Sequence, residues 1–215
     1  TNRRSTAVEA EAAALCADER FGARVRELPP LFLGAGECLV HGDLHSGSIM
    51  VPRSGVGHAR VIDAEFAHFG APMFDVGTFF AHLVFSALAQ SCEEALQHGL
   101  AGATGFCSQY LEELAVAQGT NGQQPLRAGG LLRRCWGFAG CELMRRVIGA
   151  AHSPDIDGIA DAAARSLAER RALRLGVTLV EMGTDAAADG AAERLQPSRV
   201  LASLRQVLLH FQATK

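Results

Sequence analysis

Residues 39–51 read LVHGDLHSGSIMV and residues 60–77 read RVIDAEFAHFGAPMFDVG, and these two segments decide the fold. Mostly apolar residues at 49–52 and at 59–62 flank a turn that contains two glycines. This pattern predicts a β-hairpin, and a further short strand is expected at 38–40. The polar residues just before the first hairpin strand and just after the second should therefore meet at the open end of the hairpin.

The expected register of the hairpin determines which polar residues lie together. With a turn at 53–58, Pro52 pairs with Ala59, and Ser48 then lies opposite Asp63 if no bulge intervenes. Paired strands are about 4.8 Å apart. The loop before the first strand should therefore lie close to the residues that follow the second.

Three carboxylates, those of Asp43, Asp63 and Glu65, are expected to converge around one small volume at this open end. Such a group repels itself unless a cation neutralises it, and oxygen ligands of this kind favour Mg²⁺ with waters and phosphates. In kinase-like phosphoryl transfer, one carboxylate orients the attacking hydroxyl and another, across a hairpin, holds the metal. We assign Asp43 the first role, and Asp63 and Glu65 the second.

The segments HGDLHSGS and VIDAEFAHFGAPMFDVG resemble the catalytic loop and Asp-x-Glu motif of the aminoglycoside phosphotransferase and choline kinase superfamily, and within it the 5-methylthioribose kinases. That family has Ser where related families place a metal-binding Asn, and Ser48 occupies this position. The resemblance implies an ATP and metal site formed by Ser48, Asp63, Ala64 and Glu65, with Asp43 at the substrate. Ala64 replaces the family's proline, and both carboxylates of the motif are kept.

A second resemblance lies in CELMRRVIGAAH at 141–152, which is similar to the paired-arginine segment of the same family. It implies that Arg145, Arg146 or both contact methylthioribose. The forked donors of arginine can hold several sugar oxygens or a developing phosphate charge. The alternative is that the pair belongs to a solvated stripe on a long helix, like Arg133 and Arg134 one segment earlier.

The activity implied by the resemblance is Mg²⁺-dependent transfer of the γ-phosphoryl group of ATP to the anomeric hydroxyl of 5-methylthioribose, in the cytoplasm. Other acceptors on the same fold are an aminoglycoside, choline or homoserine. Choline would call for an aromatic cage, and the chain has one Trp and one Tyr, both far from the motifs. A non-catalytic sugar-binding module is the alternative from a different functional class.

The remainder of the sequence is typical of a helical lobe. We expect an α+β, mostly helical class in which all 215 residues form a single C-terminal lobe of a protein-kinase-like fold, with the small hairpin carrying the catalytic and metal motifs. Nothing before Asp43 resembles an ATP-binding N-terminal lobe, and the chain begins with Thr, so a fragment of a longer protein is expected. The predicted helices are 5–28, which Pro29 and Pro30 end, 78–90, 93–117, 126–151, 161–181 and 198–211.

The composition of the chain argues against some classes of binding partner. A net charge of −3 and a pI near 6.2 argue against nucleic acid binding. The apolar stretch from Val76 to Ala89 is shorter than the roughly 20 residues that cross a bilayer, so we expect a buried helix and no membrane association. Six cysteines without a CxxC pair predict reduced, mostly buried thiols. The resemblance also implies a homodimer as one candidate assembly.

Several residues beside the motifs have structural explanations. We expect His41 and His45 to brace the loop by hydrogen bonding, because their spacing lacks further metal ligands. Asp75 is expected to cap a helix that begins near residue 77, or to contact the catalytic loop, and is not assigned a catalytic role. Phe66 and Phe69 lie next to the Asp-x-Glu motif in sequence and are candidates for lining the site.

Overall fold

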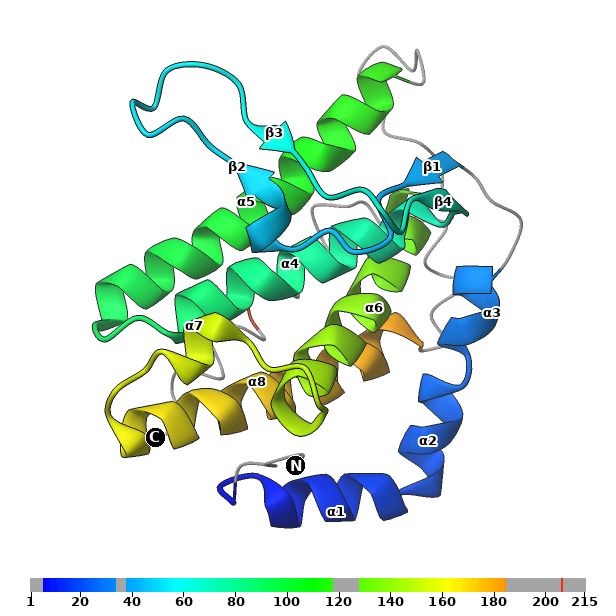
Figure 1. The fold of residues 1–215 in the computed structure, drawn as a ribbon. Helices are drawn as coiled ribbons and strands as arrows, with labels where there is room; N and C mark the ends of the chain where they lie inside the picture. Colours follow the sequence, from blue (N-terminus) through cyan, green and yellow to red (C-terminus); the bar gives the residue numbers. More distant parts are fainter. Residues whose placement is uncertain (1–5, 34–37, 118–127, 185–205, 207–215) are drawn as a thin grey trace.

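The computed structural model describes residues 6–33, 38–117, 128–184 and 206. Helices make up most of these residues, and two short antiparallel strand pairs lie on one side of them (Figure 1). The predicted α+β, mostly helical lobe is therefore confirmed. The helix predicted at 198–211 lies outside the described residues, apart from Gln206.

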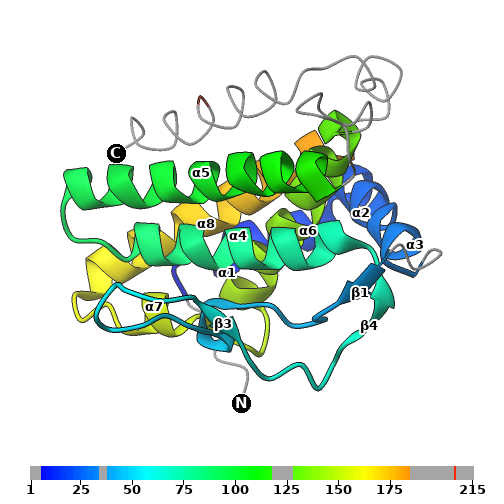
Figure 2. The same cartoon turned by 90° about the horizontal axis from the view of Figure 1, so that it is seen from above.

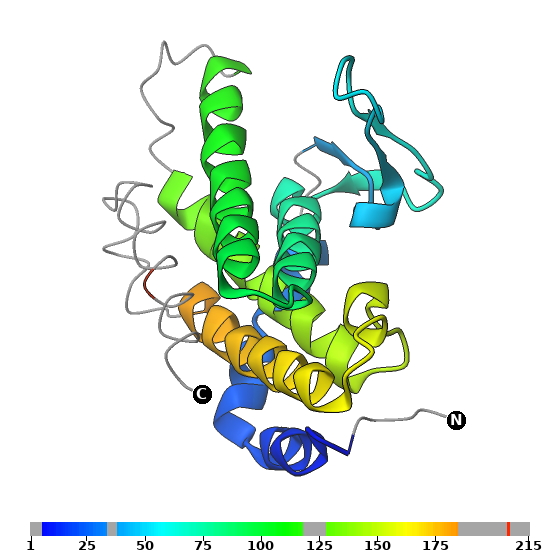
Figure 3. The same ribbon diagram turned by 90° about the vertical axis from the view of Figure 1, so that its left-hand side faces the viewer.

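Four long helices form the body of the part of the chain that the structure describes. They are α4 (Pro72–Leu88), α5 (Glu93–Ala117), α6 (Ala128–Ile148) and α8 (Ala162–Gly183). Helix α4 packs against both α5 and α6, and α6 also packs against α8. Figures 2 and 3 show α5 alongside α4, with both strand pairs on the side of α4 that faces away from α5. This order places the strands and their loops against α4.

The core is built from apolar faces of these helices. Phe80 on α4 and Trp136 on α6 are fully buried, and their ring centroids lie 5.2 Å apart. Helices α6 and α8 approach closely through Gly140 and Gly176, because a Cβ added to Gly140 would lie 2.4 Å from the carbonyl oxygen of Gly176. A residue larger than glycine at this crossing would force the two backbones apart.

The predicted N-terminal helix is divided in two. Helix α1 (Glu9–Ala17) ends at Asp18, and α2 (Glu19–Val25) begins directly after it. The backbone of Asp18 is extended, and its carboxylate accepts hydrogen bonds from the amides of the residues two and three positions later, at 2.9 and 3.0 Å. Asp18 thus acts as an N-cap, which explains the interruption.

The two prolines do not end a helix, as the sequence had suggested. Pro29 and Pro30 lie near the start of α3 (Leu28–Leu33), a third short helix of the N-terminal region. Proline is tolerated in a first helical turn because the amides there have no partner within the helix. The expectation that Pro29 and Pro30 stop the helix is therefore wrong.

The predicted hairpin is present, with a different register. Strand β2 (Ile49–Met50) pairs with β3 (Arg60–Val61) so that Ile49 faces Val61. Ser48 consequently lies opposite Ile62, whose amide donates to the Ser48 carbonyl at 2.9 Å, and not opposite Asp63. The connecting segment contains Gly55 and Gly57 with φ of 70° and 119°. Nine residues lie between the paired Met50 and Arg60, one fewer than the predicted register requires.

The strand expected at 38–40 is β1 (Cys38–Val40), and its partner is β4 (His68–Gly70). The sequence analysis did not predict β4. It leads directly into α4, which begins at Pro72, six residues earlier than predicted, because Ala71 provides an extended N-cap and proline suits the first helical position. The predicted bounds of α5 are confirmed, those of α6 and α8 are correct to within three residues, and α7 (Pro154–Asp157) is an additional short helix.

Two further expectations concern the apolar stretch 76–89 and the cysteines. In the described part of the chain, no helix is long and apolar enough to cross a membrane, and most of the apolar stretch 76–89 is buried in α4. All six cysteines are free thiols, but only half of them are buried or partly buried. The expectation of mostly buried cysteines is wrong for Cys16, Cys38 and Cys92, which lie on exposed surface.

Candidate active site

The loop at 41–48, called the catalytic loop below, is attached to the first turn of α4 by one carboxylate. Asp75 accepts the His41 amide at 2.5 Å through Oδ2 and the Gly42 amide at 3.0 Å through Oδ1. The expected contact between Asp75 and the loop is confirmed, whereas the N-cap of α4 is Ala71. Gly42 has φ of 84°, and a Cβ there would lie 2.3 Å from the Phe66 carbonyl oxygen, so this position requires glycine.

Two histidines brace the catalytic loop from within. Nδ1 of His41 accepts the Asp43 amide at 3.3 Å, and its Nε2 lies 2.8 Å from the carbonyl oxygen of Ile62, beside β3. Nδ1 of His45 accepts the Gly47 amide at 3.0 Å. Because each Nδ1 is an acceptor, the neutral rings carry their proton on Nε2. The predicted bracing role is confirmed for both.

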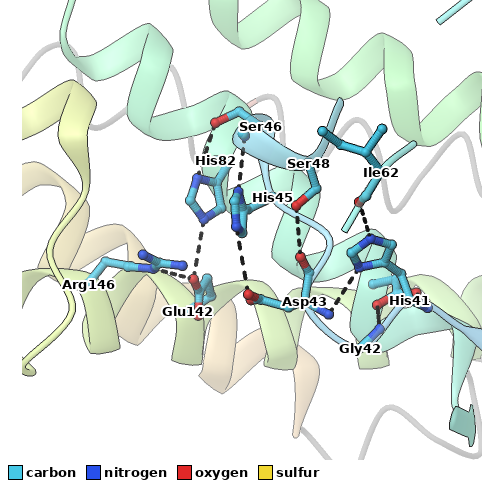
Figure 4. Close-up of polar contacts among 12 residues, drawn as sticks. His41, Gly42, Asp43, His45, Ser46, Ser48, Ile62, His82, Glu142 and Arg146 are labelled. Carbon is cyan, nitrogen blue, oxygen red and sulfur yellow. Dashed lines mark hydrogen bonds and ion pairs between the residues drawn. The ribbon is translucent and has the colours of Figure 1, made fainter. Parts of the chain in front are cut away.

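Asp43 lies at the turn of this loop with a partly exposed carboxylate. Its Oδ2 is 3.7 Å from Nε2 of His45, and its carbonyl oxygen accepts the Ser48 hydroxyl at 3.3 Å (Figure 4). Ser48 itself is buried, so its hydroxyl holds the loop backbone in place. Burial lowers the pKa of His45, although the Asp43 carboxylate acts in the opposite direction.

The three carboxylates of the motifs do not form the single cluster expected from sequence. Among the residues that the structure describes, no three His, Cys, Asp or Glu side chains are grouped so that they could hold a metal ion. The shifted register contributes to this difference, and the backbone changes direction at Asp63, with φ of 65°, and again in a turn from Ala64 to Ala67. The expectation that Asp43, Asp63 and Glu65 fill one small volume is therefore wrong.

Asp63 and Glu65 are nevertheless both exposed and separated by a single residue. Mg²⁺ is commonly held by one or two carboxylates, while waters and substrate phosphates supply its other ligands. The donor set at this edge of the hairpin fits that kind of ion.

A cavity of about 610 Å³ opens between the catalytic loop and α6. Asp43 and Arg145 both line it, which brings the predicted catalytic carboxylate and one of the predicted substrate arginines into the same space. Phe66 also lines it, but Phe69 does not and has 73% of its surface exposed on β4. The lining residues are Phe32, Gly42, Asp43, Phe66, His68, Phe74, Thr78, Phe138, Cys141, Glu142 and Arg145.

The paired arginines share one buried carboxylate. Arg145 donates to both oxygens of Glu142, from Nε at 2.7 Å and from Nη2 at 2.9 Å. Arg146 donates from Nε to Oε1 of Glu142 at 2.7 Å. The Arg145 side chain is half exposed and reaches the cavity, whereas that of Arg146 is 14% exposed and does not line it. The alternative of a plain solvated stripe is therefore wrong for Arg146, whereas Arg145 is half exposed and bound to a buried carboxylate.

Sequence reasoning missed Glu142 and its neighbour His82. His82, on α4, is buried, and its Nε2 lies 3.4 Å from Oε1 of Glu142, within ion-pair range (Figure 4). Its Nδ1 lies 3.5 Å from the hydroxyl of Ser46 in the catalytic loop. Two features of the sequence could have identified them. One is a glutamate that stands three and four residues before two arginines, and the other is a histidine inside an apolar helix.

The Glu142 carboxylate remains charged in this setting. Burial by itself would raise its pKa, but the interactions with His82, Arg145 and Arg146 outweigh burial and lower the pKa from 4.5 to about 2. One ionised carboxylate thus neutralises only one of the two guanidinium groups that contact it. A positive charge is left at the wall of the cavity, across from Asp43.

The chain is similar in sequence to known phosphotransferases. Residues 1–110 match the model of the phosphotransferase enzyme family. A methylthioribose kinase of Bacillus pumilus is 36% identical over 179 residues, which are 79% of this chain and 44% of that protein. A methylthioribose kinase of Exiguobacterium sibiricum is 35% identical over 194 residues, or 86% of this chain and 49% of that protein. The chain spans about half the length of the curated relatives it matches.

Proposed function

Because the chain belongs to the phosphotransferase enzyme family, we propose that it supplies the acceptor site for transfer of the γ-phosphoryl group of ATP to the anomeric hydroxyl of 5-methylthioribose. The observation that carries the proposal is that Asp43 and Arg145 line one cavity from two different elements. A carboxylate and a guanidinium on the walls of one space suit a neutral, hydroxyl-rich acceptor.

The lining of the cavity also suits the two parts of this acceptor. Asp43, Thr78 and Arg145 present polar groups that can bind sugar hydroxyls. The phenyl rings and the Cys141 thiol provide apolar surface for a methylthio substituent. Burial raises the pKa of Cys141 to about 11, so this thiol is neutral at physiological pH and acts as a small apolar group.

In the proposed reaction, Asp43 orients the attacking hydroxyl and accepts its proton. Arg145 holds the sugar and stabilises the charge that develops on the transferred group. Asp63 and Glu65, on either side of Ala64, would hold Mg²⁺ on the ATP phosphates, where it supplies charge neutralisation, and the Ser48 hydroxyl supports the loop from behind. Positioning and electrostatics supply the rate enhancement in such chemistry. A reaction that consumes ATP is consistent with the cytoplasm.

The proposal is tested by measuring sugar binding and phosphoryl transfer separately. Isothermal titration calorimetry of this chain with 5-methylthioribose tests the acceptor site directly. ADP formation is measured with the protein as its gene encodes it, in the presence of MgATP and either 5-methylthioribose, an aminoglycoside, choline or homoserine. We expect binding and ADP formation with 5-methylthioribose.

Replacement of the catalytic carboxylate provides the matched comparison. Asp43→Asn should lower turnover by roughly 10²–10⁴-fold, the usual contribution of a general base. Asp157→Asn, at an exposed position on α7, should leave turnover unchanged. Preference for another acceptor would reassign the substrate. Sugar binding without ADP formation would identify a binding module, and unchanged turnover in Asp43→Asn would refute the role of Asp43.

A further inference from the structure

Glu142 occupies an unusual position for an acidic residue. It is 6% exposed, yet it lines the cavity that contains Asp43 and Arg145. It contacts two arginines on its own helix and His82 on α4. Burying a carboxylate is costly unless strong partners compensate for the lost water, and here three partners do so. The site therefore contains an ionised group that none of the assigned roles uses.

The contact between Glu142 and Arg145 determines where the guanidinium lies. A half-exposed arginine samples many rotamers, and ordering it has an entropic cost. Two parallel hydrogen bonds, from Nε and Nη2 to the two carboxylate oxygens, fix both the position and the plane of the group. The remaining nitrogen, Nη1, has no hydrogen-bond partner among the described residues. Glu142 thus leaves Arg145 oriented, with donors free for a ligand in the cavity.

A second contact connects Glu142 to the catalytic loop. Nε2 of His82 lies 3.4 Å from Oε1 of Glu142 without a hydrogen bond between them, and Nδ1 of the same ring lies 3.5 Å from the Ser46 hydroxyl. The His82 ring also lies next to His45 of the same loop, with centroids 5.4 Å apart. Figure 4 shows this sequence of contacts from α6 through α4 to the loop. The elements that carry Arg145 and Asp43 are therefore joined through Glu142.

We propose that Glu142 is the positioning residue of the acceptor site: it orients Arg145 toward the acceptor. This proposal rests on the proposed function, because it names what Arg145 is oriented to bind. Glu142 does not touch the reacting atoms and acts through Arg145. An ion pair that only stabilises the helix packing would not affect acceptor affinity through Arg145.

A double-mutant cycle on 5-methylthioribose affinity separates these two roles. Glu142→Gln keeps the shape of the side chain and removes its charge, and we expect it to weaken binding by roughly tenfold or more, as loss of charge-assisted hydrogen bonds does. Arg145→Ala should weaken binding to a similar extent. The double variant should bind no more weakly than Arg145→Ala alone. Additive losses would overturn the proposal, and Glu112→Gln, exposed on α5, is the matched control.

Two further measurements keep the proposal testable if Glu142→Gln does not fold or the sugar does not bind. Arg145→Lys retains the positive charge but cannot form the two parallel hydrogen bonds to Glu142, so it should bind 5-methylthioribose about as weakly as Arg145→Ala. Wild-type affinity in Arg145→Lys would refute the positioning role. In NMR spectra, the Arg145 Nε–H signal should be protected from solvent exchange in the wild type and lose that protection in Glu142→Gln. If the wild type binds no 5-methylthioribose, the proposed substrate fails, and this signal alone decides whether Glu142 orients Arg145.

Discussion

Removal of the Asp75 carboxylate should release the catalytic loop from α4. Asp75 accepts the amides of His41 and Gly42 at 2.5 and 3.0 Å, and the residue is only 9% exposed. A hydrogen bond to a charged group contributes about 1.5–3 kcal/mol. Asp75→Ala removes two such bonds and leaves two partly buried amides without this acceptor. Since the loop can relax and admit water, we expect a loss of about 2–4 kcal/mol in the free energy of unfolding.

Urea unfolding followed by circular dichroism measures this loss in the whole chain. For a chain of this size, 3 kcal/mol corresponds to a fall in Tm of roughly 6–12 °C. Amide hydrogen exchange adds a local readout, because the His41 and Gly42 amides should exchange faster in the variant. Asp75→Asn should lie between the wild type and Asp75→Ala, since its amide offers a single acceptor oxygen.

The matched control is Glu93→Ala, which removes an exposed acidic residue from the first turn of α5. It should change the free energy of unfolding by at most about 0.5 kcal/mol. The free energy of unfolding of Asp75→Ala could lie within 0.5 kcal/mol of the wild-type value, with unchanged exchange at both amides. That result would show that the loop is held by other contacts. The role given to Asp75 would then be refuted.

Three other changes have defined outcomes. Gly42→Ala places a Cβ 2.3 Å from a backbone carbonyl oxygen at φ of 84°, so acceptor binding by calorimetry should be lost while helical circular dichroism is retained. Gly140→Ala should destabilise the α6–α8 contact by about 1–3 kcal/mol in urea, whereas Gly102→Ala, which meets open space on α5, should be neutral or slightly stabilising. The folded-state pKa of Glu142, about 2 against 4.5, lies below its ordinary value, so its contribution is present above pH 4.5. That contribution, on the order of 3 kcal/mol, should disappear as the pH falls toward 2. The free energies of unfolding of wild type and Glu142→Gln, measured as a function of pH, should converge over that range. A difference between them that stays constant with pH would contradict the ionised state assigned to Glu142.

The local pattern of residues predicted the hairpin and supplied the candidate site residues. Mostly apolar stretches around a glycine-containing turn predicted the hairpin, and the charged residues beside it made Asp43, Asp63 and Glu65 candidates. Helical spacing predicted α5 with its observed bounds. These features depend on residues that are close in sequence, where propensity and periodicity act directly.

Tertiary packing decided the remaining features. The glycine conformations at 55 and 57 set a hairpin register that placed Ile62, not Asp63, opposite Ser48. Asp75 meets the catalytic loop more than thirty residues away in sequence, and Glu142 meets His82 only because α4 packs on α6. No local pattern encodes such pairs, because they form only when buried apolar faces bring distant elements together. The sequence therefore determined which chemical groups are available, and helix packing determined which of them meet.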